Sequence, residues 1–395
     1  MRHSLAFPLL ILAALLVATP ARARRVPTSV TPPMDALLRE GLDALYRMDF
    51  PAADAAMAKA MALDPAYPHP YLGVAALDLV RYSYAAKESD SALFKGFQAD
   101  IAKAVSVSET WLKTHPNDPD ALMVLGAAHG ISGRMAITRH EWLDGFRHGR
   151  AAMKSIRLSL KLDPELYDAT LGVGMFDYYV DTIPRFAGWL AKIMLGGSRE
   201  RGLKELHLAA EKGDYGKTAA KLILVEISIE DAFGARNPAE ALRLITEVFH
   251  RYPDSAMFHS AYAVVLYENG KVDDALRESR EYLARTASGR YPSGFHAKGR
   301  ALIGTMLWAR GDLEGALAEF RAGAGETGSL KNWNVLCRAR AGQVLDALGR
   351  RPEALEAYRA AAAGGDKNSW DYQAWIKPCL SKPCVGSKFP GRFAP

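Results

Sequence analysis

The chain has 395 residues, of which 49% are apolar and 24% are charged, so it can bury a substantial core and is too apolar to be disordered as a whole. Its formal net charge is +6, or +4 without Arg2 and Arg22. Apart from Arg22, Arg24 and Arg25 there is no basic cluster, and no run alternates aromatic and basic side chains along a phosphate backbone. We therefore expect no nucleic-acid partner.

Residues 1–23 have the organisation of a secretory signal peptide. Arg2 and His3 precede an apolar run that ends at Val17, and a small-x-small pattern predicts cleavage after Ala23. The run is too short to cross the ~30 Å hydrocarbon core, so a retained membrane anchor is the less favoured alternative. We expect the processed protein in a bacterial periplasm or outside the cell, without an integral membrane segment.

Residues 24–33 are rich in proline and threonine and are expected to form a linker, and helix pairs are expected from residue 34 to residue 364. Four prolines each separate the end of one helix from the start of the next: Pro65, Pro116, Pro164 and Pro253. Asp118 and Asp254 follow two of these prolines and are available as N-caps.

Two stretches near the C-terminus, 304–323 and 342–361, align without a gap. Each has a glycine on a first helix, a glycine at a turn, an alanine on a second helix and an aromatic residue one turn later: Gly304, Gly311, Ala316 and Phe320, then Gly342, Gly349, Ala354 and Tyr358. This spacing resembles the tetratricopeptide repeat, in which antiparallel helix pairs stack on one another. The resemblance implies an all-α, tetratricopeptide-repeat-like solenoid of about eight antiparallel helix pairs.

Residues 183–197 are expected to form a helical insertion within one pair, because several apolar residues there share one helical face: Phe186, Trp189, Leu190, Ile193 and Met194. Glycines and a proline frame it: Gly172, Gly174, Pro184, Gly196, Gly197 and Gly202. This pattern is similar to the central motif of fungal inclusion-body clearance proteins and their animal tetratricopeptide relatives, and to exported bacterial tetratricopeptide proteins. The resemblance implies an adaptor rather than an enzyme. Met175 and Tyr178 precede the insertion, and with Phe186, Trp189 and Met194 they are candidates to line a cavity beneath it.

Residues 365–395 are expected to be an irregular tail. Three of its aromatic residues are expected to cover the open face of the last helix pair: Trp370, Tyr372 and Trp375. Cys379 and Cys384 are the expected disulfide, because they lie close together whereas Cys337 is isolated on a predicted helix. A proline precedes each of the two and favours extended or turn geometry.

One cluster contains residue types that can bind a metal or carry protons: His129, His140, Glu141 and His148. It has no H-E-x-x-H pair and His129 lies across a turn, so capping and surface histidines are expected instead. No nucleophile-elbow, P-loop or Rossmann glycine pattern occurs, and Cys337 is expected to be a packed thiol. We expect no catalytic residues, no cofactor and no metal.

Proteins with this repeat contact partners through the inward side of the first helix of each pair. Aligned in that way, the candidate partner-binding residues are Glu226, Glu230, Phe233, Tyr267, Lys298, Thr305, Trp308 and Gln343. Polar groups mixed with large aromatics suit a peptide groove. We expect a non-enzymatic protein or peptide interaction scaffold in the bacterial cell envelope. The alternative is a carrier of a small apolar or lipid-like ligand in a cavity closed by the 183–197 insertion.

We predict that the mature protein begins at Arg24, because the small-x-small site ends at Ala23. The intact mass of protein isolated from the envelope fraction measures this. A mass that includes residues 1–23 would contradict both the cleavage and the expected location.

Overall fold

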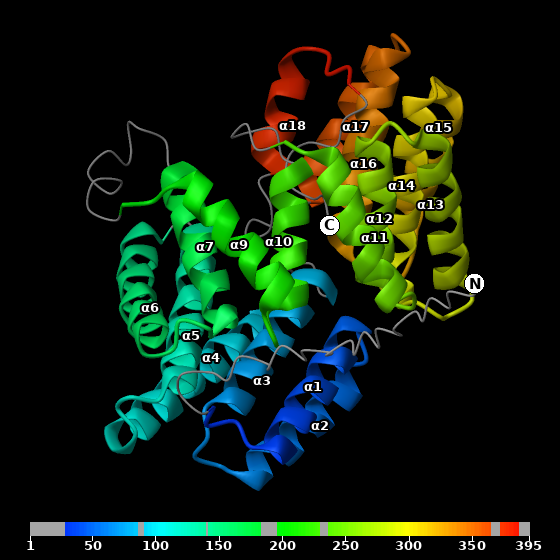
Figure 1. Ribbon diagram of the computed structural model, residues 1–395. Helices are drawn as coiled ribbons and strands as arrows, with labels where there is room; N and C mark the ends of the chain where they lie inside the picture. Colours follow the sequence, from blue (N-terminus) through cyan, green and yellow to red (C-terminus); the bar gives the residue numbers. More distant parts are fainter. Residues whose placement is uncertain are drawn as a thin grey trace, which may run out of the picture.

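The computed structural model describes residues 28–85, 91–139, 141–182, 196–229, 236–364 and 372–386, and within these ranges the regular structure is helical, without a strand (Figure 1). The helices form eight antiparallel pairs: α1 (Pro32–Tyr46) with α2 (Phe50–Leu63), α3 (His69–Val80) with α4 (Ser91–Thr114), α5 (Pro119–Thr138) with α6 (Trp142–Leu162), α7 (Tyr167–Thr182) with α9 (Arg199–Lys212), α10 (Lys217–Ile229) with α11 (Pro238–Arg251), α12 (Ala256–Glu268) with α13 (Val272–Ala287), α14 (His296–Ala309) with α15 (Leu313–Gly325), and α16 (Lys331–Ala347) with α17 (Arg351–Gly364). A short π-helix, η1 (Arg81–Ala85), extends α3, and a 3-10 turn, η2 (Ser293–Phe295), precedes α14. The all-α solenoid of about eight helix pairs is confirmed.

Small residues allow the two helices of a pair to approach closely. A Cβ atom on Gly304 would lie 2.9 Å from the Phe320 ring, and one on Gly342 would lie 2.6 Å from the Tyr358 ring. At the turns between the helices the backbone takes φ values of 84° at Gly311 and 74° at Gly349, which favour glycine. The aligned glycines therefore have the two roles that their spacing predicts.

The helix starts agree with the proline-based prediction at one site and differ at another. The Asp118 side chain caps α5 by accepting hydrogen bonds from the amides of Asp120 and Ala121. At α12 the cap is Ser255 rather than Asp254, because the helix begins one residue later than the prediction requires. Asp254 instead forms an ion pair with Arg290.

The last residues of the predicted linker are anchored to the start of α5. The Thr28 hydroxyl donates to Asp120 Oδ2 at 2.9 Å, and the Ser29 hydroxyl donates to Asp118 Oδ1 at 3.0 Å. α1 then begins at Pro32, two residues before the predicted boundary. The acidic residues that start α5 therefore also hold the N-terminal approach to α1.

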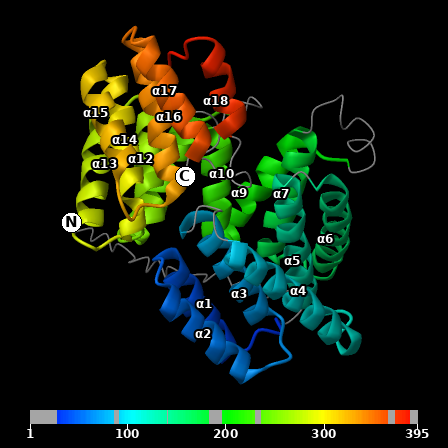
Figure 2. The same ribbon diagram turned by 180° about the vertical axis from the view of Figure 1, so that it is seen from behind.

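The first helix pair touches helices that are far away in the sequence, at an interface that we call the closing contact. The Tyr46 ring, at the end of α1, lies 5.4 Å from the Tyr252 ring and 5.9 Å from the Phe258 ring, between centroids. The Tyr252 hydroxyl donates to Asp43 at 2.6 Å, and the Tyr215 hydroxyl donates to Asp35 at 2.5 Å. Figure 1 shows the upper end of α1 beside the lower end of α11, and in the view from behind the upper end of α1 again points toward the helices of the C-terminal half (Figure 2). The solenoid thus curves until its first pair meets its fifth and sixth.

Met48 lies in the turn between α1 and α2 with φ of 62°, whereas the corresponding turn in later pairs has glycine, as at Gly311 and Gly349. A side chain in this left-handed conformation costs about 1–2 kcal/mol. The Met48 side chain packs against the apolar cluster of the closing contact. This packing offsets the backbone strain.

The tail was predicted to be irregular, but its described part, residues 372–386, begins with a helix. It contains α18 (Tyr372–Ser381), and Pro378 lies inside this helix rather than in extended chain. Ile376 and Cys379 are each 1% exposed and join the apolar core of α16 and α17. Burial of this helix therefore outweighs the local preference of its proline. Of the tail aromatics, Trp370 lies outside the described residues.

None of the helices in the described ranges is long and apolar enough to cross a membrane. Residues 1–23 and residues 183–195, which include nearly all of the predicted insertion, lie outside the described part of the chain.

We predict that Gly342→Ala is less stable than Gly325→Ala by about 1–3 kcal/mol, because the methyl group at residue 342 would overlap the Tyr358 ring. Gly325 is the matched control, since nothing lies within 4 Å of a Cβ atom built there. Urea unfolding monitored by circular dichroism measures both variants. Equal unfolding free energies would show that the close approach is not a packing constraint.

Candidate functional site

Three side chains at equivalent places in successive repeats form what we call the inward row: Tyr267 on α12, Trp308 on α14 and Asp346 on α16. The spacings between them, 41 and 38 residues, equal those between Ala275, Ala316 and Ala354 on the second helices. The three helices also lie against one another as the first helices of their pairs. Tyr267 is half-buried, whereas Trp308 is 8% and Asp346 is 7% exposed.

Arg340 lies beside this row and is fully buried. Its guanidinium carbon is 4.8 Å from the centre of the Trp308 ring and 5.5 Å from that of Phe320, within the range of cation–π attraction. Its Nη1 donates to Gln343 Oε1 at 2.7 Å. Burial lowers the pKa of Arg340 to about 10, so the side chain stays charged at neutral pH. A positive charge is thus held under the inward surface at the last repeat.

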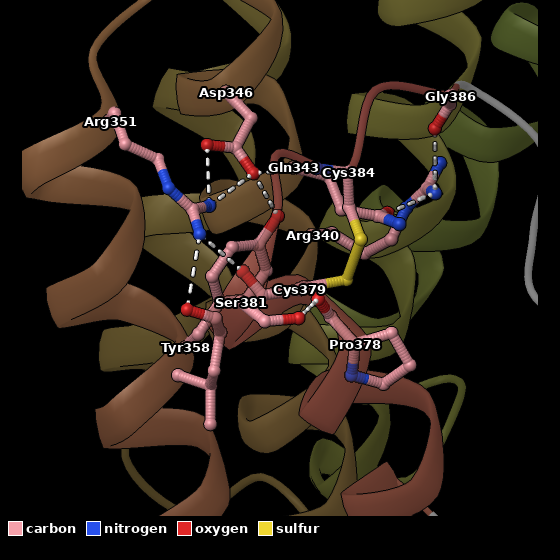
Figure 3. Close-up of a disulfide and its surroundings, with 11 residues drawn as sticks. Arg340, Gln343, Asp346, Arg351, Tyr358, Pro378, Cys379, Ser381, Cys384 and Gly386 are labelled. Carbon is pink, nitrogen blue, oxygen red and sulfur yellow. Dashed lines mark hydrogen bonds and ion pairs between the residues drawn. A yellow bond between two sulfur atoms is a disulfide. The ribbon is translucent and has the colours of Figure 1, made fainter.

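Residues 382–386, which we call the strap, follow α18 and lie against this end of the row (Figure 3). The amide of Cys384 donates to Asp346 Oδ2 at 2.8 Å, and Arg340 Nη1 donates to the carbonyl of Gly386 at 3.4 Å. The Cys379–Cys384 disulfide joins α18 to the strap, with Cα atoms 5.2 Å apart, and it is the pair that the sequence favours. Both hydrogen bonds involve main-chain atoms of the strap, whereas the side chain of Cys384 attaches the strap to α18 through the disulfide.

Asp346 is the centre of a polar network that connects the strap to α17. Its carboxylate accepts hydrogen bonds from Arg351 Nη1 at 2.9 and 3.0 Å and from the Tyr358 hydroxyl at 2.9 Å. Arg351 also donates to the carbonyl of Cys379 at 2.8 Å. Burial and the hydrogen bond to Asp346 raise the pKa of Tyr358. The carboxylate therefore remains paired with the body of the protein whether or not the strap is present.

Four of the predicted partner-binding residues are largely buried: Lys298, Thr305, Trp308 and Gln343. Thr305 is fully buried, and its hydroxyl donates to the carbonyl of Ala301 at 2.9 Å. Lys298 is 6% exposed, and its Nζ lies 5.2 to 5.8 Å from the centres of three rings, those of Tyr282, Phe295 and Trp333. Burial lowers the pKa of Lys298 to about 7. Neither Lys298 nor Thr305 is therefore accessible to a partner in this structure.

Of the three predicted partner-binding residues at or after α10, the structure describes only Glu226. Glu226 forms an ion pair with Arg134 of α5 at 3.7 Å, which connects the first helices of the third and fifth pairs. Glu230 and Phe233 lie outside the described residues.

The residues predicted to line a cavity are only partly described. Tyr178 is 2% exposed and belongs to an apolar core with Leu206 and Leu224, and the half-buried Met175 packs against the same core. Phe186, Trp189 and Met194 lie outside the described residues. A surface groove of about 350 Å³ is present elsewhere, between α13 and α15, where Leu283, Ile303 and Leu307 line it.

His129 and His148 lie together, although their spacing did not predict this. Their Nδ1 atoms are 3.2 Å apart across α5 and α6, and both rings are half-buried. Burial, and then the charge of His148, lowers the pKa of His129. Both histidines are partly exposed, so they are surface residues that also contact each other rather than helix caps. His140 lies outside the described residues, and no group of three potential metal ligands occurs in the ranges that the structure describes.

The sequence interpretation did not identify Arg340 or Asp346. Asp346 could have been found from the repeat alignment, because its position in the last repeat corresponds to that of Trp308 in the preceding repeat. Arg340 had no such signal, since its role depends on a strap carbonyl that lies 46 residues later in the chain.

We predict that Lys298→Met stabilises the protein at pH 7 and reduces the rise of stability with pH. The pKa of lysine is near 10.4 in an unfolded chain and about 7 here, so between these pH values the unfolded state binds more protons and wild-type stability increases with pH. Urea midpoints at pH 7 and pH 9 measure the effect, with the exposed Lys161→Met as the matched control. The same pH dependence in both variants would contradict the prediction.

A family model described as tetratricopeptide repeat matches residues 229–292, which extend from the end of α10 to the turn after α13. No curated protein matches the chain. Among solved structures, the human IFIT1 dimer with PPP-AAAA is 13% identical with a TM-score of 0.45, covering 89% of this chain and 85% of that one. A tetratricopeptide repeat protein from Parabacteroides merdae ATCC 43184 is 16% identical with a TM-score of 0.32, covering 78% and 99%. Yeast Tom70 is 10% identical with a TM-score of 0.40, covering 86% and 87%. The chain therefore contains a recognisable tetratricopeptide repeat at residues 229–292, within a longer solenoid of helix pairs.

Proposed function

We propose that the protein is a non-enzymatic scaffold that binds an extended segment of a partner protein along the inward row. One observation carries the proposal: Asp346 and Arg340 already hold a non-helical segment, the strap, by its main-chain amide and carbonyl groups. A surface that pairs with both kinds of main-chain group suits the binding of extended peptides.

The other two members of the inward row, Tyr267 and Trp308, would add contact area beside Asp346 and Arg340. Tyr267 is half-buried, and the largely buried Trp308 ring lies 4.8 Å from the guanidinium carbon of Arg340. Rigid aromatic side chains contribute contact area with little loss of side-chain entropy, and arginine contributes directed hydrogen bonds. The row is thus suited to a segment that runs across α12, α14 and α16.

The proposed location is the bacterial cell envelope. The pattern of residues 1–23 supports export, and a disulfide between Cys379 and Cys384 is typical of proteins in oxidising compartments. The expected absence of a nucleic-acid partner belongs to this proposal too, with the mild positive charge as its support. The carrier alternative concerns a cavity closed by the 183–197 insertion, of which residues 183–195 lie outside the described part of the chain.

The test is selection of peptides from a displayed random library on the immobilised full-length protein. We expect the selected peptides to bind the wild type and to lose roughly tenfold in affinity with Tyr267→Ala, since hot-spot aromatics commonly contribute 1–2 kcal/mol or more. Leu63→Ala is the control, because Leu63 is 51% exposed at the end of α2, outside the row. Peptides that bind both variants equally, or a single-stranded RNA that competes for the same site, would overturn the proposal.

A further inference from the structure

The strap is held differently from the helix before it. α18 buries Ile376 and Cys379, and Arg351 donates to the carbonyls of Cys379 and Leu380 at 2.8 and 3.3 Å. These contacts hold α18 on α16 and α17. The helix therefore has its own apolar and polar anchors, which do not involve the strap.

The strap, residues 382–386, has fewer apolar and polar anchors than α18. Four of these five residues are exposed, and the apolar side chain of Val385 is 66% exposed. Two main-chain hydrogen bonds, to Asp346 and to Arg340, attach the strap to α16, and the Lys382 amide donates to the carbonyl of Pro378 in α18 at 3.2 Å. The disulfide and the partly buried side chain of Cys384 complete its attachment. The disulfide keeps the Cys384 amide within reach of Asp346, because it joins Cys384 to the buried Cys379.

The strap lies where the proposed partner segment would end. Asp346 is the third member of the inward row, and Arg340 packs on the second member, Trp308. Asp346 keeps Arg351 and Tyr358 as partners without the strap, so its carboxylate stays in place when the strap leaves. The two groups would then present an acceptor and a charged donor to another extended main chain.

We propose that the strap is an intramolecular ligand, and that an extended partner segment replaces it by making the same main-chain hydrogen bonds to Asp346 and Arg340. This inference rests on the proposed function and identifies one end of its binding site. The partner chemistry is that of an extended polypeptide whose amide and carbonyl point to one side, with little demand on its side chains at these two positions.

Release of the strap depends on thiol–disulfide exchange with a dithiol reductant. One thiolate of the dithiol attacks a sulfur of the Cys379–Cys384 bond and forms a mixed disulfide, and the second thiolate then displaces the remaining cysteine. Two electrons pass to Cys379 and Cys384, whose sulfurs each take up a proton, and the reductant becomes a disulfide. α18 remains bound, while the strap competes with the partner only as a flexible extension.

The experiment measures binding of a fluorescent synthetic peptide with the sequence of residues 381–389, in which serine replaces Cys384. The proteins are the full-length oxidised wild type, the wild type with dithiothreitol, and the Cys379→Ser, Cys384→Ser double variant. We expect the reduced and double-variant proteins to bind roughly tenfold more tightly than the oxidised protein, because an intramolecular competitor has been loosened. Dithiothreitol added to the double variant is the control and should change nothing.

Hydrogen exchange gives a second readout that needs no peptide. In the oxidised protein the Cys384 amide should be protected by Asp346, and reduction should remove this protection while the amides of α12 and α13 keep theirs. Continued protection of Cys384 after reduction, or equal peptide affinity in all three proteins, would overturn the inference.

The two proposals fail in different ways. Library-selected peptides that depend on Tyr267 but bind the oxidised and reduced proteins equally would overturn the role of the strap and leave the inward row as the binding surface. Loss of the dependence on Tyr267, with strap-peptide binding still controlled by reduction, would confine binding to Asp346 and Arg340 and overturn the proposed row.

Discussion

A pair of helices cannot bury its apolar face alone, and the structure depends on how closely each pair can pack before it stacks on the next. Gly304 facing Phe320 and Gly342 facing Tyr358 set this distance in the last repeats. The same cores then join neighbouring pairs, so that Phe320, Trp333 and Tyr358 belong to one apolar cluster that α18 completes with Ile376. The surface that carries the inward row is therefore supported by a continuous core rather than by separate domains.

The polar groups of the candidate site are positioned by this core. The contacts of the buried Arg340 guanidinium include two aromatic faces, a side-chain amide and a strap carbonyl, and they offset part of the cost of burying its charge. Asp346 is oriented by Arg351 and Tyr358 from the following helix. At this end of the row, the side chains that bind main-chain groups are already oriented and lie beside rigid aromatic side chains. This preorganisation reduces the entropy lost when a peptide binds.

The sequence was sufficient for features that depend on local spacing. The glycines, the buried alanines and the aromatics of each repeat follow a period that a helical hairpin imposes, and the Asp118 cap follows from its place after Pro116. Features that depend on distant partners were missed. Pro378 argued locally against a helix, yet burial of Ile376 and Cys379 against α16 and α17 favours one.

The histidine pair was missed for a related reason. His129 and His148 meet because Gly133 and Gly145 let α5 and α6 approach closely, and this helix register is not evident from the spacing of the histidines. Arg340 likewise acquires its role from Gly386, whose position is fixed by α18 and the disulfide.

The closing contact also limits how such a chain can change during evolution. In an open solenoid each repeat touches only its neighbours, so duplication or deletion of a repeat mainly alters its length. Here Tyr46 and Met48 of the first pair pack on Tyr252 and Phe258, four and five pairs later. A pair gained or lost between α3 and α10 would rotate these surfaces away from each other and expose both. The closing contact therefore constrains the number of repeats in the first part of the chain, and it places no such constraint on the stretch between α13 and the terminal helix.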